Sequence, residues 1–143
     1  MEELINNTLI MILLGICSYF DFKERKIPVV LIFLSIGLHI AFSVYWGSFS
    51  IGSSLAGLLL GAGLCLLSVF SKGALGIGDG LLAAACGISL GFYKTLALFF
   101  YGFLLTGLIG FFFLIGKKKS RKEEMPLVPF LYLVYGSMCF LEL

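Results

Sequence analysis

The chain consists of long apolar runs separated by short polar or glycine-rich segments. The runs span residues 4–20, 27–46, 51–70, 78–92, 94–116 and 126–142. Runs of this kind can cross the hydrocarbon core of a membrane, about 30 Å thick, as α-helices. We therefore expect an all-α membrane protein, a six-transmembrane helix bundle that forms a single polytopic domain over residues 1–143.

The boundary between the fourth and fifth runs is the least obvious, because Leu81–Gly116 contains a single charged residue, Lys94. As one helix this stretch would be about 54 Å long, far more than the hydrocarbon core. The segment Gly91–Lys94 combines the charge with a glycine that weakens helices, so we expect a turn there. The fourth run is then short, and its Asp79 end is expected to lie slightly below the membrane surface, in a protein-lined cavity.

Basic residues are distributed unevenly between the two ends of the runs. Those in the loops after the first, third and fifth runs are Lys23, Arg25, Lys26, Lys72, Lys117, Lys118, Lys119, Arg121 and Lys122, and the opposite side has only Lys94. Loops rich in lysine and arginine stay in the cytoplasm. This pattern predicts that both termini lie outside, and that Asp21 and Asp79 share the cytoplasmic face.

Composition supports a membrane protein and narrows its chemistry. Hydrophobic residues make up 60% of the chain and charged residues 13%, against about 25% charged in soluble domains. The four cysteines contain no Cys-x-x-Cys pair and are expected to be buried as small hydrophobes. The single histidine, His39, is expected to be a packing residue or a hydrogen-bond donor inside the bundle. We expect no metal, no cofactor and no nucleic-acid partner. The first run lacks a basic n-region, which favours a first span over a removed signal peptide.

Small residues recur at helical spacing along several runs. The pairs are Gly57 with Gly61, Gly87 with Gly91, and Gly107 with Gly110. Glycines spaced three or four apart let membrane helices approach closely. We expect all of these glycines to serve helix packing.

Only two aspartates occur in the chain, and the first, Asp21, begins the polar segment Asp21–Pro28. The ordinary interpretation is a solvated loop, with Pro28 in the first turn of the next helix. For this loop alone that interpretation is favoured. The acidic residues are still unusual, because positive charge alone sets the topology.

The second aspartate lies in Gly76-Ile-Gly78-Asp79-Gly80, directly before an apolar run. One interpretation is structural, with Asp79 as an N-cap and the glycines as a flexible entry to the helix. The other is functional: the glycines remove side chains around one carboxylate, so an extended substrate could approach Asp79 and pair with exposed backbone. A carboxylate at membrane depth is costly unless it is paired, hydrated or used.

The last apolar run opens with Pro126 and Pro129, which alone indicate only the start of a helix. Taken together, the three segments resemble the type IV prepilin peptidase family of membrane aspartyl proteases. The family's first motif, an aspartate followed six residues later by Ile-Pro, is matched by Asp21 with Ile27 and Pro28. Its GxGD motif is matched by Gly76, Gly78 and Asp79, and its Pro-x-x-Pro-Phe stretch by Pro126, Pro129 and Phe130.

This resemblance implies an intramembrane aspartyl endopeptidase with Asp21 and Asp79 as catalytic residues. The supporting or substrate-binding residues would be Gly76, Gly78, Gly80, Ile27, Pro28, Pro126 and Pro129. The implied substrate is a type IV prepilin-like or pseudopilin protein, whose basic leader is removed after a glycine at the cytoplasmic face. The implied surroundings are the lipid bilayer of a bacterial or archaeal cytoplasmic membrane.

The chain departs from the family pattern at three supporting positions. Val29 replaces an asparagine, Leu81 a lysine and Val128 a glycine. The cysteine-bearing insertion of longer members is also absent, so we expect no methyltransferase activity. These departures keep open a non-enzymatic role, such as a pilus or secretion assembly factor.

The two carboxylates could act on one water molecule. Like charges held close resist double ionisation, so the pair is expected to share one proton. A small proton-coupled transporter that uses the same carboxylates is a further alternative, although it would place acidic residues in the middle of spans.

Overall fold

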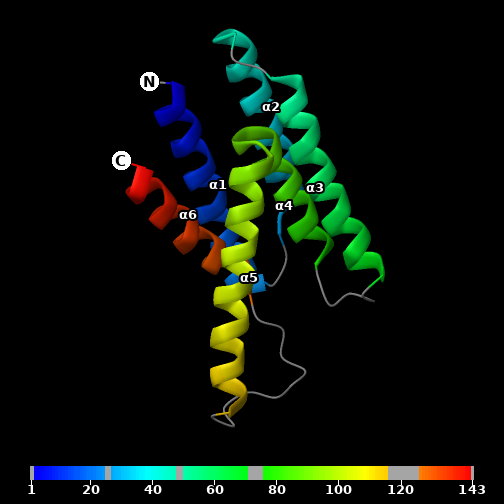
Figure 1. Ribbon diagram of the computed structural model, residues 1–143, viewed down its shortest axis with the longest axis vertical. Helices are drawn as coiled ribbons and strands as arrows, with labels where there is room; N and C mark the ends of the chain where they lie inside the picture. Colours follow the sequence, from blue (N-terminus) through cyan, green and yellow to red (C-terminus); the bar gives the residue numbers. More distant parts are fainter. Residues whose placement is uncertain (1, 25–26, 48–49, 71–75, 116–125, 143) are drawn as a thin grey trace.

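The structure, a computed structural model, describes residues 2–24, 27–47, 50–70, 76–115 and 126–142. Within these ranges it forms six α-helices, one for each predicted apolar run: α1 Glu2–Glu24, α2 Val29–Tyr45, α3 Ile51–Phe70, α4 Ile77–Leu90, α5 Phe92–Ile115 and α6 Val128–Glu142. The helices pack as a bundle (Figure 1). The prediction of an all-helical chain is confirmed.

Three of the six helices, α1, α3 and α5, are long and apolar enough to cross a membrane, whereas α2, α4 and α6 are shorter apolar helices. A membrane location is therefore supported, while six membrane crossings remain a prediction. The orientation also remains a prediction, because apart from Lys23 and Lys94 the basic residues that carry it lie outside the described residues.

A single glycine separates α4 from α5. Gly91 has φ +80° and ψ 175°, a left-handed conformation that side chains disfavour, and its N–H donates to the carbonyl of Gly87 at 3.0 Å. The turn predicted at residues 91–94 is therefore confirmed, although it occupies one residue and Lys94 already belongs to α5.

The two helices joined at Gly91 differ in length. From this shared turn α4 runs for 14 residues and α5 for 24. At 1.5 Å per residue, α4 is about 15 Å shorter, and α5 extends well past the far end of α4 in Figure 1. That recessed end of α4 contains Asp79.

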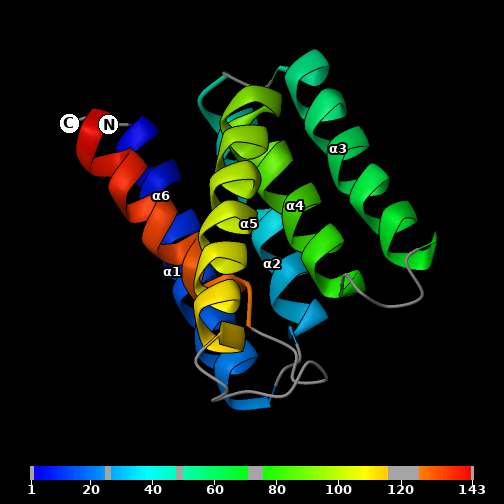
Figure 2. The same cartoon turned by 60° about the horizontal axis from the view of Figure 1, so that its bottom comes forward.

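Helix α4 is the centre of the bundle. It packs most extensively on α3 and also contacts α2, α5 and α1 (Figure 2). Its buried residues are Gly80, Leu82, Ala83, Ala85, Cys86 and Gly87. Only a few large side chains are among them, so neighbouring helices can come close to its backbone.

The contact between α3 and α4 is a close approach of two backbones. A Cβ atom at Gly57 would collide with the backbone of Gly87, and one at Gly61 would collide with Ala84. The predicted packing role of these glycines is confirmed. For Gly107 the same prediction is wrong, because a Cβ there would meet nothing within 4 Å.

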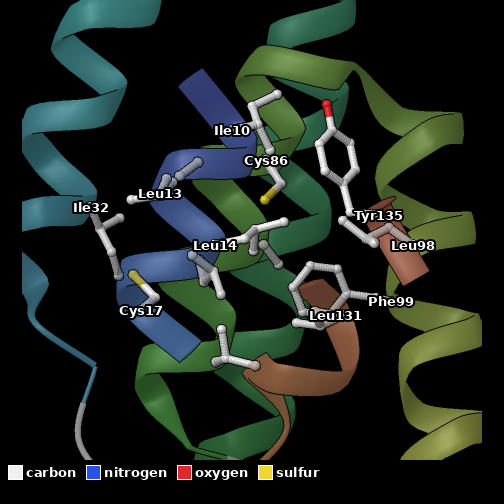
Figure 3. Packing of buried hydrophobic residues seen from close by; sticks show 14 of the residues in the cluster. Ile10, Leu13, Leu14, Cys17, Ile32, Cys86, Leu98, Phe99, Leu131 and Tyr135 are labelled. Atoms are coloured by element: carbon white, nitrogen blue, oxygen red, sulfur yellow. The ribbon is translucent and has the colours of Figure 1, made fainter. Parts of the chain in front are cut away.

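The hydrophobic core is formed by five of the six helices (Figure 3). Its largest fully buried members include Ile10 and Leu14 from α1, Ile32 from α2, Leu98 from α5 and Leu131 from α6. Helix α3 has no large fully buried side chain in it; its Leu60 and Leu64 are partly buried and pack against the core, and α3 is attached mainly through α4. Of the four cysteines, Cys17 and Cys86 are buried as predicted, whereas Cys65 and Cys139 are partly exposed.

Candidate active site

Asp21 lies in the last turn of α1 and is half-buried. Its Oδ2 atom accepts a hydrogen bond from the backbone N–H of Val128, the first residue of α6, at 3.0 Å. The first N–H groups of a helix have no partner within that helix. Asp21 therefore caps α6 from a different helix.

The cap joins two of the predicted site segments. Pro129, the second residue of α6, has no N–H to donate, and Pro126 lies directly before the bend that precedes the helix. The carbonyl of Leu127 accepts hydrogen bonds from the N–H groups of Phe130 and Leu131, at 3.1 and 3.2 Å. The prolines thus shape an entry to α6 that directs the Val128 N–H toward Asp21.

Asp79 is the third residue of α4, and Gly76 is the N-cap. The structural interpretation of Asp79 as the N-cap is therefore wrong. Its N–H donates to the carbonyl of Gly76 at 3.0 Å, and its carboxylate accepts a hydrogen bond from the N–H of Gly76. In a capping box the side chain at the third helical position accepts from the N–H of the N-cap residue, as Asp79 does here with Gly76. This contact holds the carboxylate over the start of its own helix.

The fold brings the two aspartates to the same end of the bundle. Asp79 is half-buried like Asp21, and the two lie near enough for the charge of Asp21 to reach Asp79. The carboxylates come from α1 and α4, which are far apart in sequence. Two neighbouring carboxylates have the composition of an acid–base pair.

The first and second motifs also touch. A Cβ atom at Gly78 would lie 3.1 Å from the Ile27 side chain, so Ile27 packs directly over the glycine-rich start of α4. Pro28 is the N-cap of α2, and its carbonyl accepts a hydrogen bond from the N–H of Leu31 at 3.0 Å. The Ile-Pro segment therefore covers the Gly76–Gly80 segment while starting its own helix.

The three glycines around Asp79 have different surroundings. Gly76 is exposed, Gly78 lies against Ile27, and Gly80 is buried so close to Cys65 that a Cβ would meet the Cys65 backbone. Close packing alone therefore explains why glycine is present at positions 78 and 80. Of the three, Gly76 has the most open backbone.

The three departures from the family pattern lie in different environments. Val29 is exposed at the start of α2, Leu81 is partly buried beside Asp79 in sequence, and Val128 is fully buried. At Val128 the contact with Asp21 uses the backbone N–H, which any residue except proline supplies. The exchange of glycine for valine therefore leaves this hydrogen bond in place.

Two parts of the site carry no signal in the sequence. They are the N–H of Val128, a backbone donor, and Cys65, which limits the space at Gly80. His39 lies away from the aspartates, buried in α2. Within the described ranges, no group of three or more His, Cys, Asp or Glu side chains lies together as a metal site would require.

Comparison with known proteins identifies a family for this chain. A family model described as the Type IV leader peptidase family matches residues 8–111. The match includes both aspartates, Ile27 with Pro28, and the Gly76–Gly80 segment, and it ends before α6. No curated protein and no solved structure matches the chain.

Proposed function

This chain belongs to the type IV leader peptidase family, and we propose that it is an aspartyl endopeptidase that removes the basic leader of prepilin-like or pseudopilin proteins. The family implies a peptidase and the apolar helices support a membrane location. The observation that carries the aspartyl assignment is the interaction of Asp21 with Asp79, the only two aspartates of the chain.

In the proposed mechanism the two carboxyl groups bind one water molecule and share one proton. The ionised carboxylate takes a proton from water as the oxygen attacks the scissile carbonyl, and the protonated carboxyl donates to the carbonyl oxygen. Collapse of the tetrahedral intermediate breaks the C–N bond, and a carboxyl proton passes to the leaving amine. This chemistry uses neither metal nor cofactor.

The proposed topology has all six helices crossing the membrane, both termini outside and the aspartates at the cytoplasmic face. The uneven distribution of basic residues supports this orientation. The short α4 supports a site slightly below the membrane surface, since α5 continues about 15 Å further from their shared turn. A peptide bond next to the substrate's own apolar helix could be cleaved at that depth.

A second candidate is a non-enzymatic assembly factor, because each aspartate also has a structural partner. Asp21 caps α6 through the N–H of Val128, and Asp79 binds the N–H of Gly76. Capping alone could explain why both residues are acidic. Asparagine retains a carbonyl oxygen that accepts the same hydrogen bonds, so an asparagine variant separates capping from catalysis.

The deciding experiment compares the native chain with Asp79→Asn during co-expression with a prepilin-like protein from the same genome. We expect leader cleavage by the native chain and none by the variant, with both proteins equally abundant in membranes. Equal processing by both would favour the assembly factor. Cleavage by neither would contradict the proposed peptidase.

A further inference from the structure

A groove follows the contact between α1 and α2 on the outside of the bundle. It encloses a cavity of about 110 Å³ that is lined by the α1 residues from Leu9 to Ile16 and the α2 residues from Leu31 to His39. Several of its lining side chains, including Ile12 and Leu34, are exposed. The cavity therefore opens to the surface that faces lipid in a membrane.

The groove continues toward the outer ends of the helices. A second cavity of about 20 Å³ shares Leu9 with the first and extends the groove to Asn6 on α1 and Trp46 after α2. At the opposite end of the groove, the first cavity is lined by Ile16, five residues from Asp21, and by Leu31, three residues from Pro28. The groove thus starts about two turns or less from the aspartate site and runs away from it along the bundle.

Almost the whole lining is apolar, and its one exceptional group is His39. This side chain is 3% exposed, and its Nε2 atom has no hydrogen-bond partner within the described part of the chain. The nearby Ser35 hydroxyl is satisfied, since it donates to the carbonyl of Ile32 at 2.7 Å. This nitrogen does not face the cavity, so the groove presents an almost wholly apolar wall to a bound group.

Two other helix contacts near the aspartates are closed by packing. A Cβ atom at Gly15 of α1 would lie 3.4 Å from the ring of Tyr132 on α6, and glycines close the contact between α3 and α4. The contact between α1 and α2 differs from these two, because it leaves space for another side chain.

We propose that this groove binds the apolar helix of the substrate, the segment that follows the scissile bond. The proposal rests on the proposed function, because a leader peptidase must hold a substrate whose helix stays in the membrane. A groove that begins beside Asp21 and runs along α1 would align that helix with the site. A cavity of about 150 Å³ holds a benzene molecule, so 110 Å³ accepts about one aliphatic side chain of the bound helix.

Photocrosslinking tests the groove with a matched pair of neighbouring residues. Leu34 and Phe33 are each 61% exposed on α2, and Leu34 alone of the two lines the groove. A photoreactive benzophenone amino acid at Leu34, in an Asp79→Asn background that keeps the substrate uncut, should capture the substrate helix at about ten times the yield seen at Phe33. Equal yields, or capture of lipid alone at Leu34, would overturn the proposal.

Kinetics of matched tryptophan variants distinguish a failure of docking from a failure of the proposed function. Leu34→Trp should fill the groove and raise KM about tenfold with kcat within about twofold, whereas Phe33→Trp should change neither. A soluble leader peptide without the apolar helix should be cut equally by both. Cleavage with equal KM would overturn the docking site alone, and absence of cleavage by the native chain would overturn the peptidase and the docking site together.

Discussion

The two aspartates are held by two pairs of helices that pack in opposite ways. Asp79 belongs to the pair α3 and α4, whose backbones meet at glycines such as Gly57 and Gly87. Asp21 belongs to the pair α1 and α6, which is joined by hydrogen bonds to polar side chains. Close backbone contacts fix α4 against α3 at several points between Gly80 and Gly87, whereas α6 is held against α1 by side-chain packing together with two hydrogen bonds.

Two such hydrogen bonds join α1 and α6. Asp21 accepts from the N–H of Val128, the first residue of α6, at 3.0 Å, and halfway along α6 the hydroxyl of Tyr135 donates to Oδ1 of Asn7 at 3.1 Å. The position of Asp79 should therefore respond to changes in volume, and that of Asp21 to the loss of polar atoms. The predictions below test this difference.

The largest effect is expected at Asp21, where catalysis and capping can be separated. Asp21→Asn keeps an oxygen for the Val128 N–H but cannot act as an acid–base group, so we expect cleavage to fall about a thousandfold with stability nearly unchanged. Asp21→Ala should lose the same activity and also about 1 kcal/mol of stability, because the cap is gone. Cleavage assays measure the loss of activity, and thermal unfolding in detergent measures the loss of stability. Normal cleavage by Asp21→Asn would show that Asp21 serves only as a helix cap.

A volume change at the α3–α4 contact should give the next largest effect. The Cβ atom of Gly57→Ala would meet the carbonyl group of Gly87, so we expect a loss of about 3 kcal/mol. Gly63→Ala is the matched control on the same helix, because its Cβ would meet nothing within 4 Å. The control should be stabilised by up to about 1 kcal/mol, since alanine is the better helix former. Equal stability of the two variants would show that the close contact does not form.

The same logic predicts a smaller effect on activity beside Asp79. The Cβ of Gly80→Ala would meet the backbone of Cys65, which cannot move aside, so α4 must shift and cleavage should fall about tenfold to a hundredfold. Gly78→Ala would meet Cβ and Cδ1 of Ile27, each at 3.1 Å, so a shift of a few tenths of an ångström relieves the contact. Its loss should be smaller and should be relieved in part by Ile27→Val, which removes Cδ1 and keeps Cβ. Cleavage rates per folded enzyme measure the two losses. A larger loss at Gly78 than at Gly80 would show that the contact with Ile27, and not the contact with Cys65, fixes the position of Asp79.

The sequence was sufficient to predict the helices and the turn between α4 and α5. Hydrophobic runs and one charged break predicted six helices, and Gly91 is where the chain turns. Helical spacing predicted the contact of Gly57 with α4, but it failed at Gly107, because spacing does not say whether a neighbouring helix is present. A glycine pattern is thus necessary for close packing and not sufficient.

The candidate site could be located from the sequence at its two aspartates, but not at their partners. Asp21 and Asp79 stood out as the only aspartates in an apolar chain, and family resemblance connected them. The partner of Asp21 is the backbone N–H of Val128, and every residue except proline has such a group. The groove beside α1 depends on how α2 packs, which no local pattern encodes.

The smallest effect is expected at the hydrogen bond between Tyr135 of α6 and Asn7 of α1. Tyr135→Phe removes the hydroxyl that donates to Asn7 and should cost about 0.6 kcal/mol, the average for such bonds between membrane helices. Tyr101→Phe is the control, because Tyr101 is 54% exposed on α5. A double-mutant cycle with Asn7→Ala isolates the bond from other effects of either change. Cleavage should stay nearly native throughout, because Asp21 keeps its own bond to Val128 at the start of α6. A loss of cleavage as large as that of Gly80→Ala would contradict the comparison. It would mean that the loss of one hydrogen bond halfway along α6 displaces Asp21 as strongly as a change of volume displaces Asp79.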